Sequence, residues 1–264
     1  MTGLRYPRTT LAILSSGSAL LFVVLHRYQS SWKASNIPLA THGHENSVAV
    51  TKLNTLKRDL YQHRITLEIS ANRLKPGIEN NEILARFTQG FFGGWVFSPE
   101  RWFFNYTRLS LTNTDKLENI ELERSPIQEV WDLSSLSQKS LPPSGSLLFG
   151  IFLLSEKLPL KTAGQPGTRE PIANTAPGGD GDFVSAEFVA GGSDAYELVS
   201  SHRFEVTREN GRKEGKQDIV TVTFSHVSCN SVTGRPYSTF FQWLHNVYAR
   251  LLFADGIRAV LEAK

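Results

Sequence analysis

The clearest alternation of apolar and polar positions lies in the last third of the chain. Residues 196–207 and 219–229 both alternate, and Asn210 and Gly211 stand between them. Such alternation is typical of half-buried strands, and an Asn-Gly pair between two strands favours a tight hairpin turn. Apolar residues then recur at helical spacing over residues 239–261. We therefore predict a long β-hairpin that is followed by a long amphipathic helix.

Earlier parts of the chain carry the same two patterns in shorter pieces. Residues 64–70 alternate cleanly and predict a first strand, and residues 51–61 favour a short helix before it. Two more helices are expected at residues 80–92 and 98–106, because each combines a capping residue, an acidic first turn and apolar residues at helical spacing. Shorter strand-like pieces follow at residues 108–111, 120–122, 127–133, 146–154 and 184–188.

This order of elements predicts an α+β domain with an antiparallel sheet of about seven strands and a long C-terminal helix across it. Residues 158–182 hold four prolines and five glycines with little periodicity, so we expect a mobile loop inserted in the domain. We divide the chain into a membrane anchor at residues 1–30, a juxtamembrane linker at 31–62 and the folded domain at 63–264.

An apolar run near the N-terminus predicts a transmembrane helix. Residues 11–25 are apolar except for three serines and a glycine, and basic residues flank the run on both sides. The run is shorter than the ~20 residues that cross a bilayer, but neighbouring residues and a snorkelling Arg27 extend it. We predict an uncleaved single-pass anchor and favour the secretory pathway. A cleaved signal peptide is one alternative. A mitochondrial membrane is the other, because the first acidic residue is Glu45.

One motif bears on the compartment. Asn105, Tyr106 and Thr107 form the only N-x-[ST] sequon of the chain. If the domain faces a secretory lumen, Asn105 can carry a glycan. Glycosidase sensitivity at this residue would exclude a mitochondrial location.

Composition and missing motifs exclude several classes of function. The formal net charge is only +3 and no dense block of Lys and Arg occurs, so nucleic-acid binding is not expected. The single cysteine, Cys229, excludes an internal disulfide and a cysteine-based structural zinc site within this chain. Neither a G-x-x-x-x-G-K-[ST] nor a G-x-G-x-x-G motif is present, and we expect no cofactor.

The order of the elements resembles that of the helix-grip fold of START-domain and Bet v 1-like proteins. The resemblance covers residues 64–264 and rests on element order, without a signature motif. In that mapping, residues 65–69 are the first strand, 83–92 and 99–106 are the supporting helix pair, and 240–261 are the helix that a curved sheet wraps. The resemblance implies an apolar cavity between the sheet and this helix. The chain also resembles single-span fungal membrane proteins, again without a diagnostic motif.

Aromatic residues gather in two stretches that such a cavity could use. Residues 91–104 are the most aromatic part of the chain, and residues 243–248 add more aromatic side chains to the C-terminal helix. Such side chains fill a core, line the entrance to an apolar ligand site, or form a surface that dips into a membrane. The ligand-binding candidates are Phe91, Trp95, Trp102, Phe204, Phe224, Trp243 and Tyr248.

Two histidines fall on the apolar faces of the predicted hairpin. Aligning these faces sets His202 near Phe224 and Ser200 near His226, so that the imidazoles are diagonal neighbours. A neutral imidazole in an apolar pocket can act as a general base or a hydrogen-bond donor, which makes His202 and His226 the catalytic candidates. The other interpretation is that backbone groups, hydroxyls or solvent satisfy both rings. A register slip of one residue would turn both outward.

The remaining polar residues are weaker candidates for a functional site. His245 lies on the C-terminal helix and is expected to pack there. The spacing of His202, His226 and His245 matches no zinc motif, and we predict no metal site unless all three converge. Glu187 lies opposite its apolar neighbours on a predicted strand, which indicates a solvated carboxylate.

These patterns predict a membrane-anchored protein that binds an apolar small molecule, such as a lipid or a polyketide-like compound, between sheet and C-terminal helix. The membrane and that molecule are the expected partners. The first alternative is a cofactor-independent cyclase, isomerase or dehydratase that uses His202 and His226 for proton transfer. The second alternative is a structural or interaction protein without a ligand.

Overall fold

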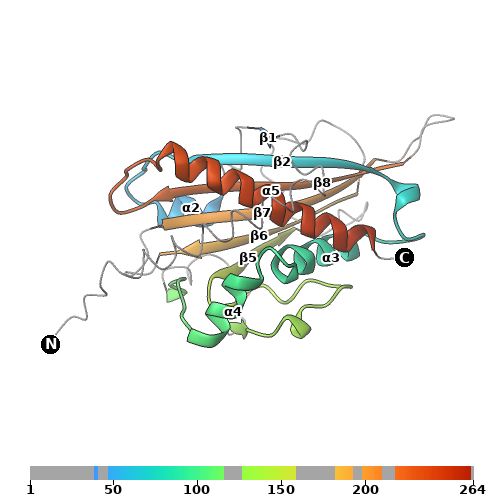
Figure 1. Ribbon diagram of the computed structural model, residues 1–264, viewed down its shortest axis with the longest axis horizontal. Coiled ribbons are helices and arrows are strands. Elements are labelled where there is room, and N and C mark those ends of the chain that lie inside the picture. The colour runs from blue at the N-terminus through green and yellow to red at the C-terminus, as the bar shows by residue number, and fades with distance from the viewer. Residues whose placement is uncertain are drawn as a thin grey trace, which may run out of the picture. The chain divides into compact units, whose positions relative to one another are not determined.

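One mixed sheet forms the centre of the computed structural model, in the strand order β1-β2-β8-β7-β6-β5-β4-β3 (Figure 1). The structure describes residues 39–40, 47–115, 127–158, 182–192, 198–209 and 218–262, all within the compact unit Pro38–Lys264. Neighbouring strands are antiparallel except β3 and β4, which are parallel. The strands are β1 (Leu39–Ala40), β2 (Tyr61–Ser70), β3 (Gln128–Val130), β4 (Ser146–Leu148), β5 (Phe152–Leu158), β6 (Asp182–Gly191), β7 (Leu198–Glu209) and β8 (Ile219–Asn230).

Helices cover both faces of this sheet. On one face, α5 (Thr239–Leu261) crosses the strands and packs against α3 (Asn80–Gly93), which α4 (Ser98–Thr107) follows (Figure 1). On the other face, α2 (Val48–Leu53) contributes Val50 and Leu53 to a cluster of side chains from β4, β5, β6, β7 and β8. Two short 3-10 helices complete the described elements: η2 (Ala71–Arg73) and η4 (Leu133–Ser135).

Phenylalanine rings fill the space between the sheet and the helix pair α3 and α5. Phe91 of α3 lies with its ring centroid 4.8 Å from that of Phe204 on β7 and 5.1 Å from that of Phe224 on β8. Phe87 contacts Phe253 of α5 at 5.4 Å. Tilted and edge-on contacts at these distances are the favourable geometries of aromatic pairs, and every one of these rings is buried. The rings therefore hold the two helices to the sheet.

The predicted α+β class is confirmed, as are the helix pair, the hairpin and the long C-terminal helix. The strands β2 to β8 make up the expected seven, and β1 adds a two-residue piece at the edge. The sheet is mixed, however, because β3 pairs with β4 in the parallel direction. The short pieces at residues 120–122 and most of the insertion at 158–182 lie outside the described residues.

Some helices and strands begin or end at other residues than predicted, where the apolar pattern was ambiguous. The apolar run at residues 146–154 is two strands, because Phe149 and Gly150 turn the chain with φ values of 53° and 72°. The helix predicted at residues 51–61 was largely wrong: α2 overlaps it only at residues 51–53, and Tyr61 begins β2. The helix starts earlier because the Ser47 hydroxyl caps it by accepting the Val50 N–H at 3.1 Å. Residues 108–111 form no strand.

The folded unit begins earlier in the chain than residue 63, because β1, α2 and the first residues of β2 all belong to it. Within the described residues, no helix combines the length and the apolarity needed to cross a bilayer. The predicted anchor at residues 11–25 lies outside the described residues, and so does most of the predicted linker before Ser47.

Glycines let α3 and α5 approach closely. A Cβ atom at Gly256 would lie 2.6 Å from Cε2 of Phe87, and one at Gly90 would lie 2.7 Å from the carbonyl oxygen of Asp255. Gly256 is thus a contact point, although from the sequence alone it only weakens the end of a helix.

We expect Gly256→Ala to destabilise the fold by about 1–3 kcal/mol, because the added methyl group overpacks the interface. Helix propensity alone predicts the opposite sign, a gain of about 1 kcal/mol. Urea unfolding followed by circular dichroism measures the difference. Thr239→Ala, at an exposed position of the same helix, serves as the control and should change stability by less than about 0.5 kcal/mol. A more stable Gly256→Ala protein would contradict the close contact.

Candidate metal centre

Three histidines form a row across neighbouring strands on the face that α5 covers. His226 of β8 stands directly opposite His63 of β2 on one side and directly opposite His202 of β7 on the other. Residues that pair across antiparallel strands point to the same face, and neighbouring strands are about 4.8 Å apart. The ring centroids accordingly lie 4.9 Å apart for His63 and His226 and 4.7 Å apart for His202 and His226.

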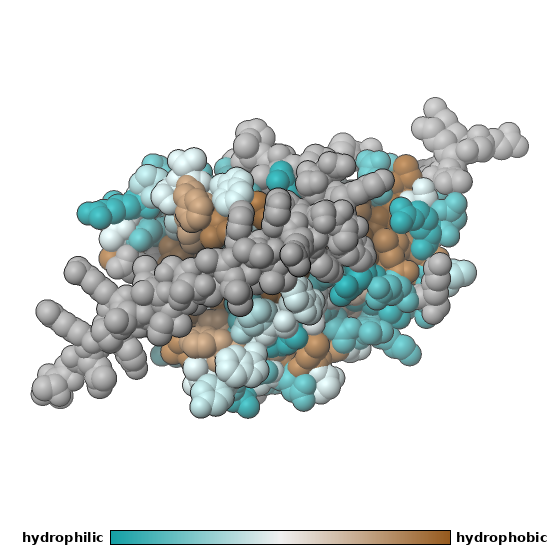
Figure 2. Space-filling model, in the orientation of Figure 1, coloured by the Kyte–Doolittle hydropathy of each residue, from teal (hydrophilic) through white to brown (hydrophobic). Residues whose placement is uncertain are grey.

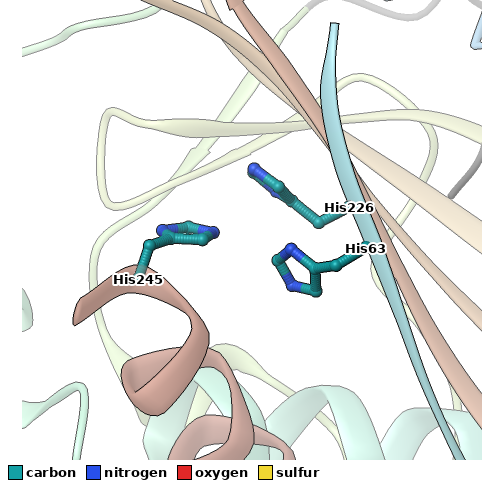
Figure 3. Close-up of side chains that lie close together, drawn as sticks. All are labelled: His63, His226 and His245. Carbon is teal, nitrogen blue, oxygen red and sulfur yellow. The ribbon is translucent and has the colours of Figure 1, made fainter. Parts of the chain in front are cut away.

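A fourth histidine, His245, comes from α5 and lies against the row. Its ring centroid is 4.5 Å from that of His226 and 5.3 Å from that of His63. Figure 3 shows the three rings of His63, His226 and His245 turned toward one another, two from the sheet and one from the helix. One nitrogen from each of these three rings lies within 4.8 Å of the other two. We call these three residues the histidine trio.

Several nitrogens of this group are buried without a hydrogen-bond partner. The nitrogens that are buried and unpartnered are both nitrogens of His63, Nδ1 of His226, Nε2 of His245 and Nδ1 of His202. Nε2 of His226 does have a hydroxyl partner, Ser228 Oγ, at 3.0 Å. Buried polar atoms in native proteins nearly always have a partner, so a group of unpartnered nitrogens indicates a site for a water, an ion or a ligand.

The four imidazoles are neutral at physiological pH. Burial is the main cause in every case: it lowers the pKa of His63 to about 2, that of His202 to about 3 and that of His245 to about 4. Burial also brings the pKa of His226 well below its ordinary value, and repulsion from the neighbouring histidines adds to the effect. A neutral imidazole keeps the lone pair that a metal ion binds, so the trio is in the protonation state of a ligand set.

Aromatic residues surround the trio and shield it from solvent. Tyr61 contacts all three rings at centroid distances of 5.8–6.2 Å, and its hydroxyl donates to Asn246 Oδ1 at 2.5 Å. Burial raises the pKa of Tyr61 to about 12, so the phenol stays protonated. Phe241 lies over His245 in a stacked orientation and is 42% exposed. The trio is therefore enclosed but lies one side chain below the surface at the N-terminal half of α5.

The predicted catalytic pair does meet, but the predicted register was wrong by two residues. His202 pairs with His226 rather than with Phe224, and Ser200 pairs with Ser228. Because side chains alternate with a period of two, a slip of two residues leaves both histidines on the same face. They are therefore direct neighbours instead of diagonal ones.

The predicted ligand-binding aromatics do not gather in one place. Phe91, Phe204 and Phe224 are buried in mutual ring contacts, and Phe224 also stacks on His202. Trp95, Trp102 and Trp243 are exposed by 49%, 68% and 45%. Figure 2 shows hydrophobic and hydrophilic residues interspersed on the viewed face. The binding of an apolar molecule in a cavity under α5 stays a prediction.

Two further candidates lie around α4. Tyr248 of α5 lies beside Glu100, and burial together with the carboxylate charge raises the pKa of Tyr248 well above its ordinary value. Asn105 lies within α4 as a half-buried residue whose Oδ1 is buried. Its glycosylation stays a prediction. An open hollow of about 680 Å³ borders α4 at Ser98, Pro99, Arg101, Trp102, Phe103 and Asn105, none of which belongs to the histidine group.

The expectation that Glu187 is solvated was wrong. Its carboxylate is buried and accepts hydrogen bonds from the hydroxyls of Ser201, at 2.7 Å, and of Ser47. The reason is that α2 covers the second face of the sheet, so an outward position on β6 becomes an interior one. Both hydroxyls donate to the same oxygen, Oε1, and these hydrogen bonds offset part of the cost of burying the carboxyl group.

His63 is the functional candidate that sequence reasoning missed. The predicted strand started at residue 64, whereas β2 starts at Tyr61. Extending the alternation of Ile65, Leu67 and Ile69 upstream by one step places His63 on the same apolar face. That signal is present in the sequence, but the pairing of His63 with His226 depends on β2 lying beside the last strand.

Comparison with known proteins does not identify a function for this site. No protein-family model, curated protein or solved structure matches the chain. The function is therefore argued from the side chains themselves.

Proposed function

We propose that the protein binds a divalent transition metal ion, with Zn²⁺ as the first choice, through the histidine trio. One observation carries the proposal: three neutral imidazoles from three elements of the fold bring one nitrogen each within 4.8 Å of one another, and each ring has at least one buried nitrogen without a hydrogen-bond partner. If neither an ion nor another ligand occupies the site, the buried nitrogens stay unsatisfied, which costs free energy.

The donor set selects the kind of metal. Imidazole nitrogen suits zinc, copper, nickel and iron, whereas magnesium and calcium take oxygen ligands. The trio holds no thiolate, which soft copper(I) prefers, and no carboxylate, which completes the facial triad of non-haem iron. Three histidines are the protein ligands of one well-known type of zinc site, which leaves the fourth position open.

The rings have to draw together slightly to hold one ion. Nitrogens bound to a tetrahedral zinc at about 2.0–2.1 Å lie about 3.3 Å apart. The trio is wider than this, and the required movement is on the order of 1 Å, a small rotation of imidazole side chains. His245 is the least buried of the three and can make most of this movement.

A metal ion bound by the trio would connect separate elements of the fold. An ion held there links α5 to β2 and β8, two neighbouring strands that lie far apart in the sequence. We infer a helix-grip domain from this topology, since β2 lies beside β8, α3 and α4 follow β2, and α5 crosses the sheet. In that fold the metal centre lies between the sheet and the gripped helix, beside the phenylalanine core.

Metal content is the direct test. We expect the full-length chain, purified without a polyhistidine tag, to hold close to one zinc per molecule by mass spectrometry of the metal. Calorimetric titration of the metal-free protein should give one site. His63→Gln, His226→Gln and His245→Gln should each weaken zinc binding by more than about 100-fold, since losing even a group that only orients a ligand costs 10–100-fold.

Asp59→Asn, an exposed change just before β2, is the matched control and should keep the affinity of the unchanged protein. The three glutamine variants have to retain the circular dichroism spectrum of the folded chain for the comparison to count. If the unchanged, folded protein takes up no stoichiometric zinc, cobalt, nickel or copper, metal binding is not its function.

A further inference from the structure

The metal centre proposed above has three ligands from the protein, which leaves its fourth position to be assigned. Zinc sites with four protein ligands are closed, and those with three keep one position for an external ligand. The nearest candidate for a fourth protein ligand is His202. Its ring lies on the far side of His226 from His63, stacks on Phe224 at 5.7 Å and meets the edge of Phe152 at 5.2 Å. His202 is thus packed into the aromatic core and is not part of the trio.

The charge around the site is the second consideration. Three neutral imidazoles leave the double positive charge of the ion uncompensated, and Arg250 adds positive charge near His63. Among the described residues, no carboxylate forms a hydrogen bond, an ion pair or a charge interaction with the four histidines. A buried cation without a counter-charge is costly, so an anion is favoured at the open position.

Access is the third consideration. His245 is only half-buried, and Phe241, which stacks on it, is substantially exposed. The α5 side of the site therefore borders the surface, whereas the sheet side is closed by strands and by Phe224. Phe241 is thus a partly exposed side chain that separates His245 from solvent, and a small ligand would approach the metal from this side.

We propose that the open coordination position binds a small anionic oxygen donor, hydroxide or a carboxylate, which completes the metal centre. This inference rests on the proposed metal site and adds the chemical class of its ligand. The anion supplies both the fourth donor atom and the negative charge that the protein does not provide. The aromatic surroundings limit the ligand to a small anion or to the carboxylate end of an apolar acid.

Cobalt(II) substitution tests the open position, with azide and acetate as the probes. The full-length protein is loaded with Co²⁺, and its visible absorption is followed while each anion is added at constant ionic strength. We expect a change in band position and intensity that saturates with one anion per cobalt for both probes. Sodium perchlorate, which coordinates metals poorly, is the control and should leave the spectrum unchanged.

Two failures are distinguishable. If Co²⁺ and Zn²⁺ do not bind, the metal site itself is refuted. If Co²⁺ binds with the intensity of a four-coordinate site and neither azide nor acetate changes the spectrum, the site is closed and this inference is overturned. His202→Gln then identifies the cause: a response to azide that appears only in this variant assigns the fourth position to His202. A response to azide that is equal in His202→Gln and in the unchanged protein supports the open site.

Discussion

The metal-free protein is expected to lose about 4 kcal/mol of its stability between pH 7.5 and pH 5.5. The folded-state pKa values of His63, His202 and His245 are about 2, 3 and 4, all below the ordinary value of 6.5. In this pH window the histidines become protonated in the unfolded chain but stay neutral in the folded chain. The free energy of unfolding therefore falls as pH drops through 6.5. Each group contributes about 1.4 kcal/mol per pH unit below its unfolded pKa.

The expected loss is large compared with the stability of a typical domain. Three such histidines lower the free energy of unfolding by about 4 kcal/mol at pH 5.5, and His226 shifts in the same direction. Domains of this size are stable by about 5–15 kcal/mol in total. Glu100 acts in the opposite sense, because burial raises its pKa and acid then favours the folded state, but it is one group against four.

Urea unfolding at the two pH values, in the presence of a chelator, measures this loss. His202→Gln removes one of the titrating groups and should reduce the loss between pH 7.5 and pH 5.5 by about 1.4 kcal/mol, even if the variant is less stable throughout. Adding zinc in place of the chelator should raise stability at pH 7.5 by about 2.7 kcal/mol at a concentration 100 times the dissociation constant. Equal unfolding free energies at pH 7.5 and pH 5.5 would show that the histidines are not buried as a neutral group.

Replacing Asp255 with alanine is the second change with a large expected effect. Asp255 is a buried residue of α5 whose Oδ2 accepts the Val96 N–H at 2.9 Å, and its Oδ1 lies 3.5 Å from Arg258. It therefore fastens the turn between α3 and α4 to the last helix. Asp255→Ala leaves the buried Val96 N–H without an acceptor and removes one of the two carboxylates that pair with Arg258, so we expect a loss of about 2–3 kcal/mol.

Glu262→Ala is the matched control for the charge. Glu262 also pairs with Arg258, at 3.8 Å, but its side chain is 70% exposed. Exposed pairs contribute little, so its removal should cost less than about 1 kcal/mol. Asp255→Asn keeps an acceptor oxygen for Val96 and should fall between the two. Similar losses for Asp255→Ala and Glu262→Ala would mean that the buried hydrogen bond to Val96 contributes nothing.

Asp255 illustrates a contact that a sequence pattern within one helix cannot predict. The i,i+3 and i,i+4 spacing of Asp255, Arg258 and Glu262 favours ion pairs along α5, and both pairs are present. By itself, this pattern is typical of the exposed face of a helix. Asp255 is buried instead because α3 and α4 meet α5 at this point, and a pattern within one helix carries no information about which other helix approaches it.

Periodicity determined much of the fold. The alternation of Ile65, Leu67 and Ile69, the two strands of the hairpin and the helical spacing after Ser238 all reflect burial on one face, which is a local property of each element. The α+β class, the helix pair and the C-terminal helix follow from these local patterns. The exact register of β7 and β8 did not, because a slip of two residues satisfies the same alternation.

Only the tertiary structure decided the candidate site. His63, His202, His226 and His245 come from four elements, and the distance between His63 and His226 along the chain exceeds 160 residues. They meet because β2 lies beside the last strand and α5 crosses both, contacts that long-range packing alone creates. The sequence by itself placed apolar faces on strands and helices. It could not show that histidines from three of these elements lie close together. Their convergence depends on the strand order and on the register between distant segments.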